Sequence, residues 1–275
     1  MTAIALFGAG GKMGVRLSRN LQASSHDVRH VEPGEAGRAR LLQELGIACV
    51  DPAQALDRVE IVILAVPDTH IGQVSHEIAP ALRPGTMVMA LDAAAPFAGH
   101  LPDRPDLTYF VTHPCHPPIF NDEVDPAARD DRFGGLHARQ SIVSALMQGP
   151  EAHYTLGEEI ARTIWAPVLR SHRVTVEQMA LLEPGLSETV CASLLDVMRE
   201  AMDEVVARGV PAEAARDFLL GHMNILGSVI FKHIPGAFSD ACNKAITFGK
   251  PALMREDWKR VFEPAELAAS IQRIT

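Results

Sequence analysis

Residues 2–14 read TAIALFGAGGKMG, an apolar run that ends in glycines, and residues 12–23 continue with helical spacing of apolar side chains. A strand that passes through glycines into a helix is typical of the first turn of a dinucleotide-binding sheet. The spacing here is GxxGxxG, which departs from the common GxGxxG. It still allows a tight turn and leaves the N–H groups of a helix N-terminus open to a pyrophosphate. We therefore expect a dinucleotide to bind at Gly8, Gly10, Gly11, Lys12, Met13 and Gly14.

Short apolar runs alternate with helical patterns through the first half of the chain. Beyond residues 2–7, we expect strands over 27–31, 59–66, 86–91, 107–112 and 141–146, and a second helix over 37–45. This alternation predicts a parallel sheet wrapped by helices, the α/β class. From about residue 173, long helical periodicity covers 174–208 and 211–231, with an interruption at Pro184 and Gly185. We predict an N-terminal Rossmann domain, a doubly wound sheet, over residues 1–172, and an all-helical substrate-binding and dimerisation domain over 173–275.

The composition favours a small-molecule enzyme of the cytoplasm. The net charge of −9 offers no attraction to a nucleic acid backbone. The four cysteines are widely spaced, which favours free thiols over a disulfide framework. No secretory signal is evident, and the longest later apolar stretch, residues 218–231, is too short to span a bilayer. We therefore expect no nucleic acid partner and no membrane association.

Three further strand ends are expected to line the cofactor. Glu32 follows the second strand, where a carboxylate can accept hydrogen bonds from both ribose hydroxyls and repel a 2′-phosphate, so NAD is preferred over NADP. On its own, Glu32 could equally be a solvated turn residue before Pro33. The next long strand ends in Val66, Pro67 and Asp68, at the sheet edge that faces the cofactor. Asp92, which two small alanines follow, takes the equivalent place one strand further on.

Histidines and glutamates provide the candidate chemistry. His113 and His116 lie in a proline-rich segment, residues 113–135, which we expect to be a loop without regular structure. Imidazoles at a cofactor edge can move protons or bind a metal, although single loop histidines are often surface residues. Glu183 and Glu188 flank the proline–glycine break within an apolar stretch, where carboxylates are costly to bury unless they are paired or bound to a metal. Both could instead face solvent.

The chain resembles the β-hydroxyacid and phosphogluconate dehydrogenase superfamily. The resemblance rests on the glycine loop, the strand end VPD at 66–68, the segment THPCHPP at 112–118, LEPGLSET at 182–189 and the helical second half. That superfamily's usual catalytic lysine, with an asparagine four residues on, has no counterpart in residues 174–208, where Glu183 and Glu188 stand instead. Ordinary β-hydroxyacid oxidation is therefore not expected.

The branch of the superfamily that these strings resemble implies an NAD-dependent oxidation of a branched sugar acid, followed by migration of a hydroxymethyl group. A divalent cation, zinc before others, would polarise the new ketone. The roles of metal ligand and proton carrier could be divided in several ways among His113, His116, Glu183 and Glu188. Our leading assignment makes His113 and Glu183 the metal ligands and His116 and Glu188 the proton carriers. The alternatives are a simple NAD-dependent dehydrogenase of another hydroxy acid without rearrangement, and a non-catalytic NAD sensor. The helices predict a homodimer.

Overall fold

The computed structural model describes all 275 residues and divides them into two compact units. The first unit comprises Met1–Leu182 together with Ala268–Thr275, and the second comprises Glu183–Leu267. All the strands belong to the first unit, whereas the second contains only helices and loops. The expected class, a Rossmann sheet followed by an all-helical domain, is confirmed. The exact division at residue 172 stays a prediction.

Seven strands form one sheet in the order β2-β1-β3-β4-β5-β6-β7. Neighbouring strands are parallel except β5 and β6, which run antiparallel. β3 and β4 are buried along their whole length, as expected for central parallel strands. The strands are β1 (Ala3–Phe7), β2 (Asp27–Val31), β3 (Ile61–Leu64), β4 (Met87–Ala90), β5 (Thr108–Pro114), β6 (Gln140–Gln148) and β7 (Val168–Arg173).

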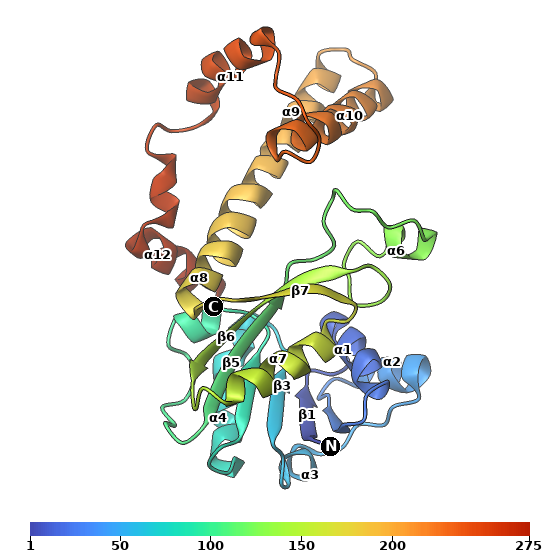
Figure 1. The fold of residues 1–275 in the computed structure, drawn as a ribbon, viewed down its shortest axis with the longest axis vertical. Coiled ribbons are helices and arrows are strands. Elements are labelled where there is room, and N and C mark those ends of the chain that lie inside the picture. The colour runs from blue at the N-terminus through green and yellow to red at the C-terminus, as the bar shows by residue number, and fades with distance from the viewer. The chain divides into compact units, whose positions relative to one another are not determined.

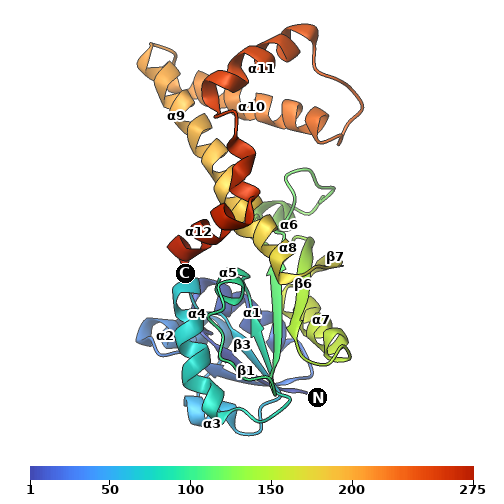
Figure 2. The same ribbon diagram turned by 90° about the vertical axis from the view of Figure 1, so that its left-hand side faces the viewer.

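Helices cover both faces of this sheet (Figures 1 and 2). One buried cluster joins alternate strand residues, such as Leu6 and Ile63, to α1 and α7, and a second joins the opposite strand face to α3 and α4. This two-sided burial explains why the central strands read as continuous apolar runs. The helices between Met1 and Leu182 are α1 (Lys12–Gln22), α2 (Glu35–Leu45), α3 (Pro52–Leu56), α4 (Asp68–Ile78), α5 (Ala94–Phe97), α6 (Pro126–Asp130), α7 (His153–Ile164) and α8 (Val176–Ala180), with a 3-10 turn over Ala79–Ala81.

The long helix expected over residues 174–208 passes through Pro184 by widening rather than breaking. Leu181–Ala192 forms a π-helical segment between α8 and α9 (Ser193–Ala207). A proline has no N–H to donate, and a π-helical segment is an irregularity that often occurs at functional sites. The remaining helices are α10 (Ala212–Ile230), α11 (Asp240–Leu253), a 3-10 turn over Trp258–Phe262 and α12 (Pro264–Ile274). No helix is both long enough and apolar enough to cross a membrane.

The segment of residues 113–135 has more regular structure than its prolines suggested. β5 continues through His113 to Pro114, and α6 forms within the segment after Asp125, whose side chain caps the helix by accepting from the Ala127 N–H. The expectation of a loop without regular structure was therefore wrong at these two places. The last strand, β7, was not predicted at all, because its polar sequence VLRSHR lacks the apolar pattern of a buried strand.

Candidate functional site

The glycine loop between β1 and α1 is tightly packed. Gly8 has φ +75°, a left-handed conformation that favours glycine, and a Cβ at this position would collide with the Ala65 carbonyl oxygen. A Cβ on Gly14 would collide with the carbonyl of Gly8. The Gly11 N–H donates to the Gly8 carbonyl oxygen over 3.1 Å, which closes the turn. The loop thus brings backbone N–H groups to the start of α1, as an anionic phosphate group requires.

Glu32 lies directly beside this loop. One carboxylate oxygen accepts a hydrogen bond from the Gly10 N–H at 2.9 Å, and the other accepts from the Gly34 N–H at 2.8 Å. The carboxylate therefore stands at the end of β2 next to the turn that was expected to hold the dinucleotide, which is where a ribose hydroxyl would be bound. Its negative charge would oppose a 2′-phosphate at that position.

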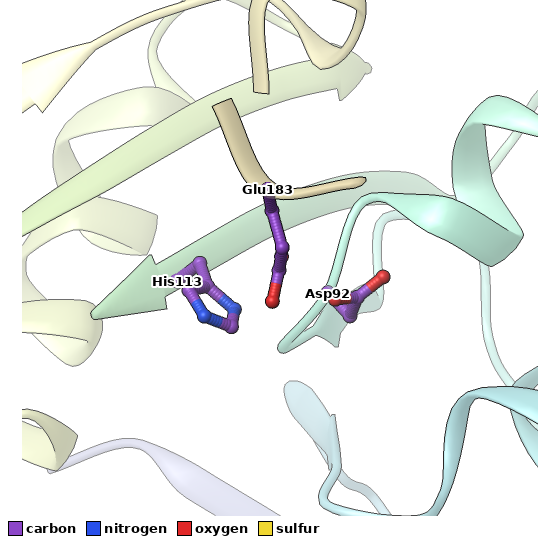
Figure 3. A group of neighbouring side chains, drawn as sticks. All are labelled: Asp92, His113 and Glu183. Atoms are coloured by element: carbon purple, nitrogen blue, oxygen red, sulfur yellow. The ribbon is translucent and has the colours of Figure 1, made fainter. Parts of the chain in front are cut away.

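Asp92, His113 and Glu183 bring their ligand atoms together, each pair within 4.8 Å. Figure 3 shows the Glu183 carboxylate pointing between the His113 ring and Asp92. Asp92 follows the end of β4, His113 lies near the end of β5, and Glu183 follows α8 after two intervening residues. All three side chains are half-buried. Two carboxylates and one imidazole at this spacing form a donor set that a divalent cation could use.

Backbone carbonyls fix the proton positions of both histidines. His113 Nδ1 lies 2.8 Å from the Leu91 carbonyl oxygen, and His116 Nδ1 lies 2.8 Å from that of Phe133. Because a carbonyl can only accept, each neutral ring must carry its hydrogen on Nδ1 and keep a lone pair on Nε2. Nε2 of His113 is thereby the atom suited to bind a metal, and Nε2 of His116 is suited to accept a proton.

His116 combines three unusual features. Its φ of +58° is rare for a residue other than glycine, and such conformations concentrate at functional sites. Its ring centroid lies 6.0 Å from that of His113. Burial lowers the pKa of His116 from its ordinary value, and the neighbouring His113 acts in the same direction, whereas the hydrogen bond to Phe133 opposes the shift. The imidazole is therefore held neutral near pH 7, the form in which it can take up a proton.

Asp68, the first residue of α4, faces the same group. Burial raises the pKa of Asp68 to about 6, the negative charge of Asp92 adds to the rise, and His113 opposes it. Asp92 and His113 thus both act on the pKa of Asp68 at this edge of the sheet, and shifted pKa values are common at sites of proton transfer and metal binding. Val66 and Pro67 precede Asp68 at the same strand end.

The structure brings some of the expected residues together and adds one. His113 and Glu183, the leading pair, meet, and His116 lies next to His113. Glu188 lies five residues further along the π-helical segment, is exposed and is not a member of the three-residue group. Asp92 was expected only to line the cofactor site. Its position in the sequence could have indicated this role. Asp92 follows β4, and His113 follows the apolar part of β5. Because the carboxyl ends of adjacent parallel strands meet at one edge of the sheet, the two side chains come close together.

Known proteins match the chain over its full length. Residues 121–275 match the family model described as phosphogluconate dehydrogenase (decarboxylating), C-terminal part, and residues 3–94 match NADP oxidoreductase, coenzyme F420-dependent. A Rhizobium rhizogenes protein named D-apionate oxidoisomerase is 74% identical over 275 residues, which cover 100% of both chains. A Cupriavidus necator protein of the same name is 72% identical over 272 residues, 99% of both chains.

A solved structure agrees with these sequence matches. It is described as a semialdehyde dehydrogenase NAD-binding protein from Cupriavidus necator in complex with calcium and NAD. It is 72% identical, superimposes with a TM-score of 0.99 and covers 100% of both chains. The chain is therefore an oxidoreductase that belongs to the D-apionate oxidoisomerase family, within the phosphogluconate dehydrogenase superfamily.

Proposed function

We propose that the chain oxidises D-apionate with NAD and rearranges the oxidised product to 3-oxo-isoapionate. The observation that supports this most is the group of Asp92, His113 and Glu183, because simple hydride transfer needs no such donor set. The names of the full-length relatives supply the substrate. Glu32 beside the glycine loop, and the NAD complex of the Cupriavidus necator protein, favour NAD as the oxidant.

A divalent cation is the second cofactor of this proposal, held by Asp92, His113 and Glu183. Ligand atoms within 4.8 Å of one another suit one ion with bonds of roughly 2.0–2.6 Å. The mixed nitrogen and oxygen donors fit zinc, which remains our prediction, and the two carboxylates also fit calcium, the ion of the Cupriavidus necator complex. A bound cation would supply Lewis acidity to the C2 oxygen and the neighbouring C3 hydroxyl.

The reaction divides into an oxidation and a carbon shift. In the first, the C2 hydroxyl loses its proton, and the C2–H bond breaks with transfer of hydride to NAD, which leaves a ketone at C2. In the second, the C3 hydroxyl loses its proton, the C3–CH2OH bond breaks, and a new C2–CH2OH bond forms. C3 becomes the ketone, and the C2 oxygen takes up a proton.

Each loss of a proton in this sequence needs a nearby base, and the same group, once protonated, can return a proton to the C2 oxygen. His116 is the leading candidate, because its Nε2 keeps a free lone pair while Nδ1 donates to the Phe133 carbonyl oxygen. Glu188, our second candidate, follows Glu183 along the same helical segment. The glycine loop, with Gly8, Gly10, Gly11, Lys12, Met13 and Gly14, would hold the dinucleotide phosphates, and Val66, Pro67 and Asp68 would line the path to the nicotinamide.

The proposed assembly is a homodimer formed through the helical unit. No residue of α9 or α11 is buried. Large apolar side chains remain exposed, including Phe231 at 76% and Phe248 at 85%. Apolar helical surface of this extent usually marks a protein–protein interface, and a second copy of the chain presents the same surface in return. A cytoplasmic location also stays a prediction.

Product analysis tests the proposal directly. The protein is incubated with NAD and 13C-labelled D-apionate, and the product is identified by NMR. We expect a ketone carbon with one CH2OH neighbour on one side and a quaternary carbon on the other. A ketone that still adjoins the carboxylate would mean oxidation without rearrangement, and the simple dehydrogenase would replace our proposal.

Removal and return of metal tests the ion. A chelator should abolish product formation while leaving NAD binding intact, and elemental analysis of the purified protein should find a divalent ion. Activity restored by zinc, and less by calcium, would support our choice of zinc; the reverse order would make calcium the functional ion. Full activity after complete metal removal would refute the metal-assisted mechanism.

A further inference from the structure

Two cations of α1 have no acidic partner. Lys12 is the first residue of this helix, and Arg16 follows four residues later on the same face. Neither forms an ion pair with a carboxylate, whereas Arg19, in the next turn, pairs with Glu44 at 3.6 Å. The Nε atom of Arg16 is buried without a hydrogen-bond acceptor. Lys12 and Arg16 thus differ from the ordinary paired cations of this surface.

The two positive charges destabilise the start of α1 unless an anion binds beside them. A positive charge in the first turn of a helix opposes the helix dipole, and like charges four residues apart repel. The chain has 34 acidic against 25 basic residues, so carboxylates were available as partners. A buried guanidinium N–H without an acceptor adds to the cost. Each of these costs would be relieved by an anionic ligand at the start of α1.

Phe133 holds both cations in place. Lys12 Nζ lies 4.9 Å and Arg16 Cζ lies 4.6 Å from the centre of the Phe133 ring. The backbone around Phe133 is fixed on its C-terminal side, because the Asp131 carboxylate accepts hydrogen bonds from the N–H groups of Gly134, Leu136, His137 and Ala138. Both cations therefore lie against one ring, and Lys12, as the first residue of α1, places this ring beside the end of the glycine loop.

We propose that Lys12 and Arg16, held by Phe133, form a cationic clamp that binds the diphosphate group of the dinucleotide. This inference rests on the proposed function, in which NAD is the ligand of the glycine loop. A guanidinium supplies paired donors that match phosphate oxygens, and the N–H groups at the start of α1 supply others. The new assignments are Arg16, as a binding residue one turn beyond the loop, and Phe133, as a positioning residue.

Phe133 also connects the clamp to His116. Its carbonyl oxygen accepts the hydrogen bond from His116 Nδ1, and the two ring centroids lie 5.0 Å apart. One residue thus contacts both cations of the clamp through its ring and orients the proposed base through its backbone. Because the backbone contact does not need the aromatic ring, a substitution of the side chain separates the two roles.

Binding measurements with three probes that contain adenosine test the clamp. The probes are NAD, ADP and adenosine, which share the adenosine group, while only NAD and ADP carry a diphosphate. Arg16→Gln should weaken binding of NAD and ADP about tenfold or more and leave adenosine binding unchanged, since one charge-assisted pair is lost. Arg19→Gln on the same helix is the matched control and should bind all three like the wild type.

The outcomes separate this inference from the proposed function. Wild-type affinity of Arg16→Gln for both NAD and ADP would overturn the clamp, whatever reaction the protein catalyses. Equal weakening for adenosine would also overturn it, because the effect would then be structural. If the wild type bound ADP but not NAD, the proposed oxidation would fail, whereas the comparison of ADP with adenosine would still decide the clamp. Inorganic pyrophosphate should displace ADP from the wild type and less effectively from Arg16→Gln; equal displacement would count against the clamp.

Two substitutions of Phe133 test the positioning role. Phe133→Leu removes the ring and keeps the carbonyl, so the KM for NAD should rise several-fold while kcat changes less. Phe133→Tyr keeps an aromatic face and should restore the wild-type KM. A fall in kcat with no change in the KM for NAD, or failure of Phe133→Tyr to restore the KM, would show that the ring does not position the clamp.

Discussion

His30 makes the stability of the sheet depend on pH. It lies in β2, is only 6% exposed, and its Nε2 atom has no hydrogen-bond partner. Burial lowers the pKa of His30 from 6.5 to about 4, because a charged ring would lose its hydration and place an unpaired N–H in the interior. His30→Leu replaces the imidazole with an apolar side chain of similar size and removes the titration.

The sign and size of the effect follow from the two pKa values. Between pH 6.5 and 4 the unfolded chain binds a proton at His30 and the folded chain does not, so folding stability is lost as the pH falls through this window. From pH 7 to pH 5, the contribution of this group to the free energy of unfolding falls by about 2 kcal/mol. Below pH 4 the folded chain also binds the proton, and the loss levels off.

Urea unfolding of the wild type and of His30→Leu, monitored by circular dichroism at pH 7 and at pH 5, measures this contribution. The wild type should lose about 2 kcal/mol more than His30→Leu over this interval. His76→Gln, which removes an exposed imidazole from α4, is the control and should follow the wild type. Equal losses in the wild type and His30→Leu would refute the assignment of the acid sensitivity to burial of His30.

Four further predictions concern the site and the assembly. Glu32→Ala should narrow the preference for NAD over NADP in kcat/KM, because the charge that opposes a 2′-phosphate is removed; an unchanged ratio would contradict this role. Gly14→Ala should lower the melting temperature and abolish NAD binding, since its Cβ would collide with the Gly8 carbonyl oxygen. His113→Ala and Glu183→Gln should each reduce product formation by orders of magnitude while NAD affinity, measured by fluorescence titration, stays near the wild-type value. Phe231→Asp should shift the mass measured by light scattering from a dimer toward a monomer, and an unchanged dimer would exclude this surface from the interface.

The cofactor half of the fold could be predicted from sequence because its signals are local. The glycines, the apolar strand before them and the helix after them occupy adjacent positions, and steric demands at Gly8 and Gly14 leave few other residues possible. β1 and β2 differ from the predicted strands by at most one residue. The central strands were also recognisable, because burial on both faces requires a continuous apolar run.

Features that depend on distant partners were harder to predict. β7 pairs only with β6 and lies at the edge of the sheet, where exposed arginine and histidine side chains are tolerated. These polar residues remove the apolar pattern by which a strand is predicted from sequence. The helix through Pro184 was expected to kink or break, because proline cannot donate the usual hydrogen bond. Widening to a π-helical segment over Leu181–Ala192 keeps the chain helical, and no local sequence pattern predicted this widening.

The register of the sheet explains how the candidate metal group arises. Ala90 of β4 pairs with Val111 of β5, and the two strands are parallel, so Asp92 and His113, each two residues further on, reach the same level at the same edge. The Leu91 carbonyl oxygen then accepts the hydrogen bond from His113 Nδ1, which fixes the orientation of that ring. Sequence shows both residues near strand ends but not which strands are neighbours or how they align. Glu183 joins them because α8 packs on β6 through Met179 and the helix continues past Ala180. The sheet therefore sets two of the three ligands rigidly, and the third comes from the helical segment whose geometry is irregular at Pro184.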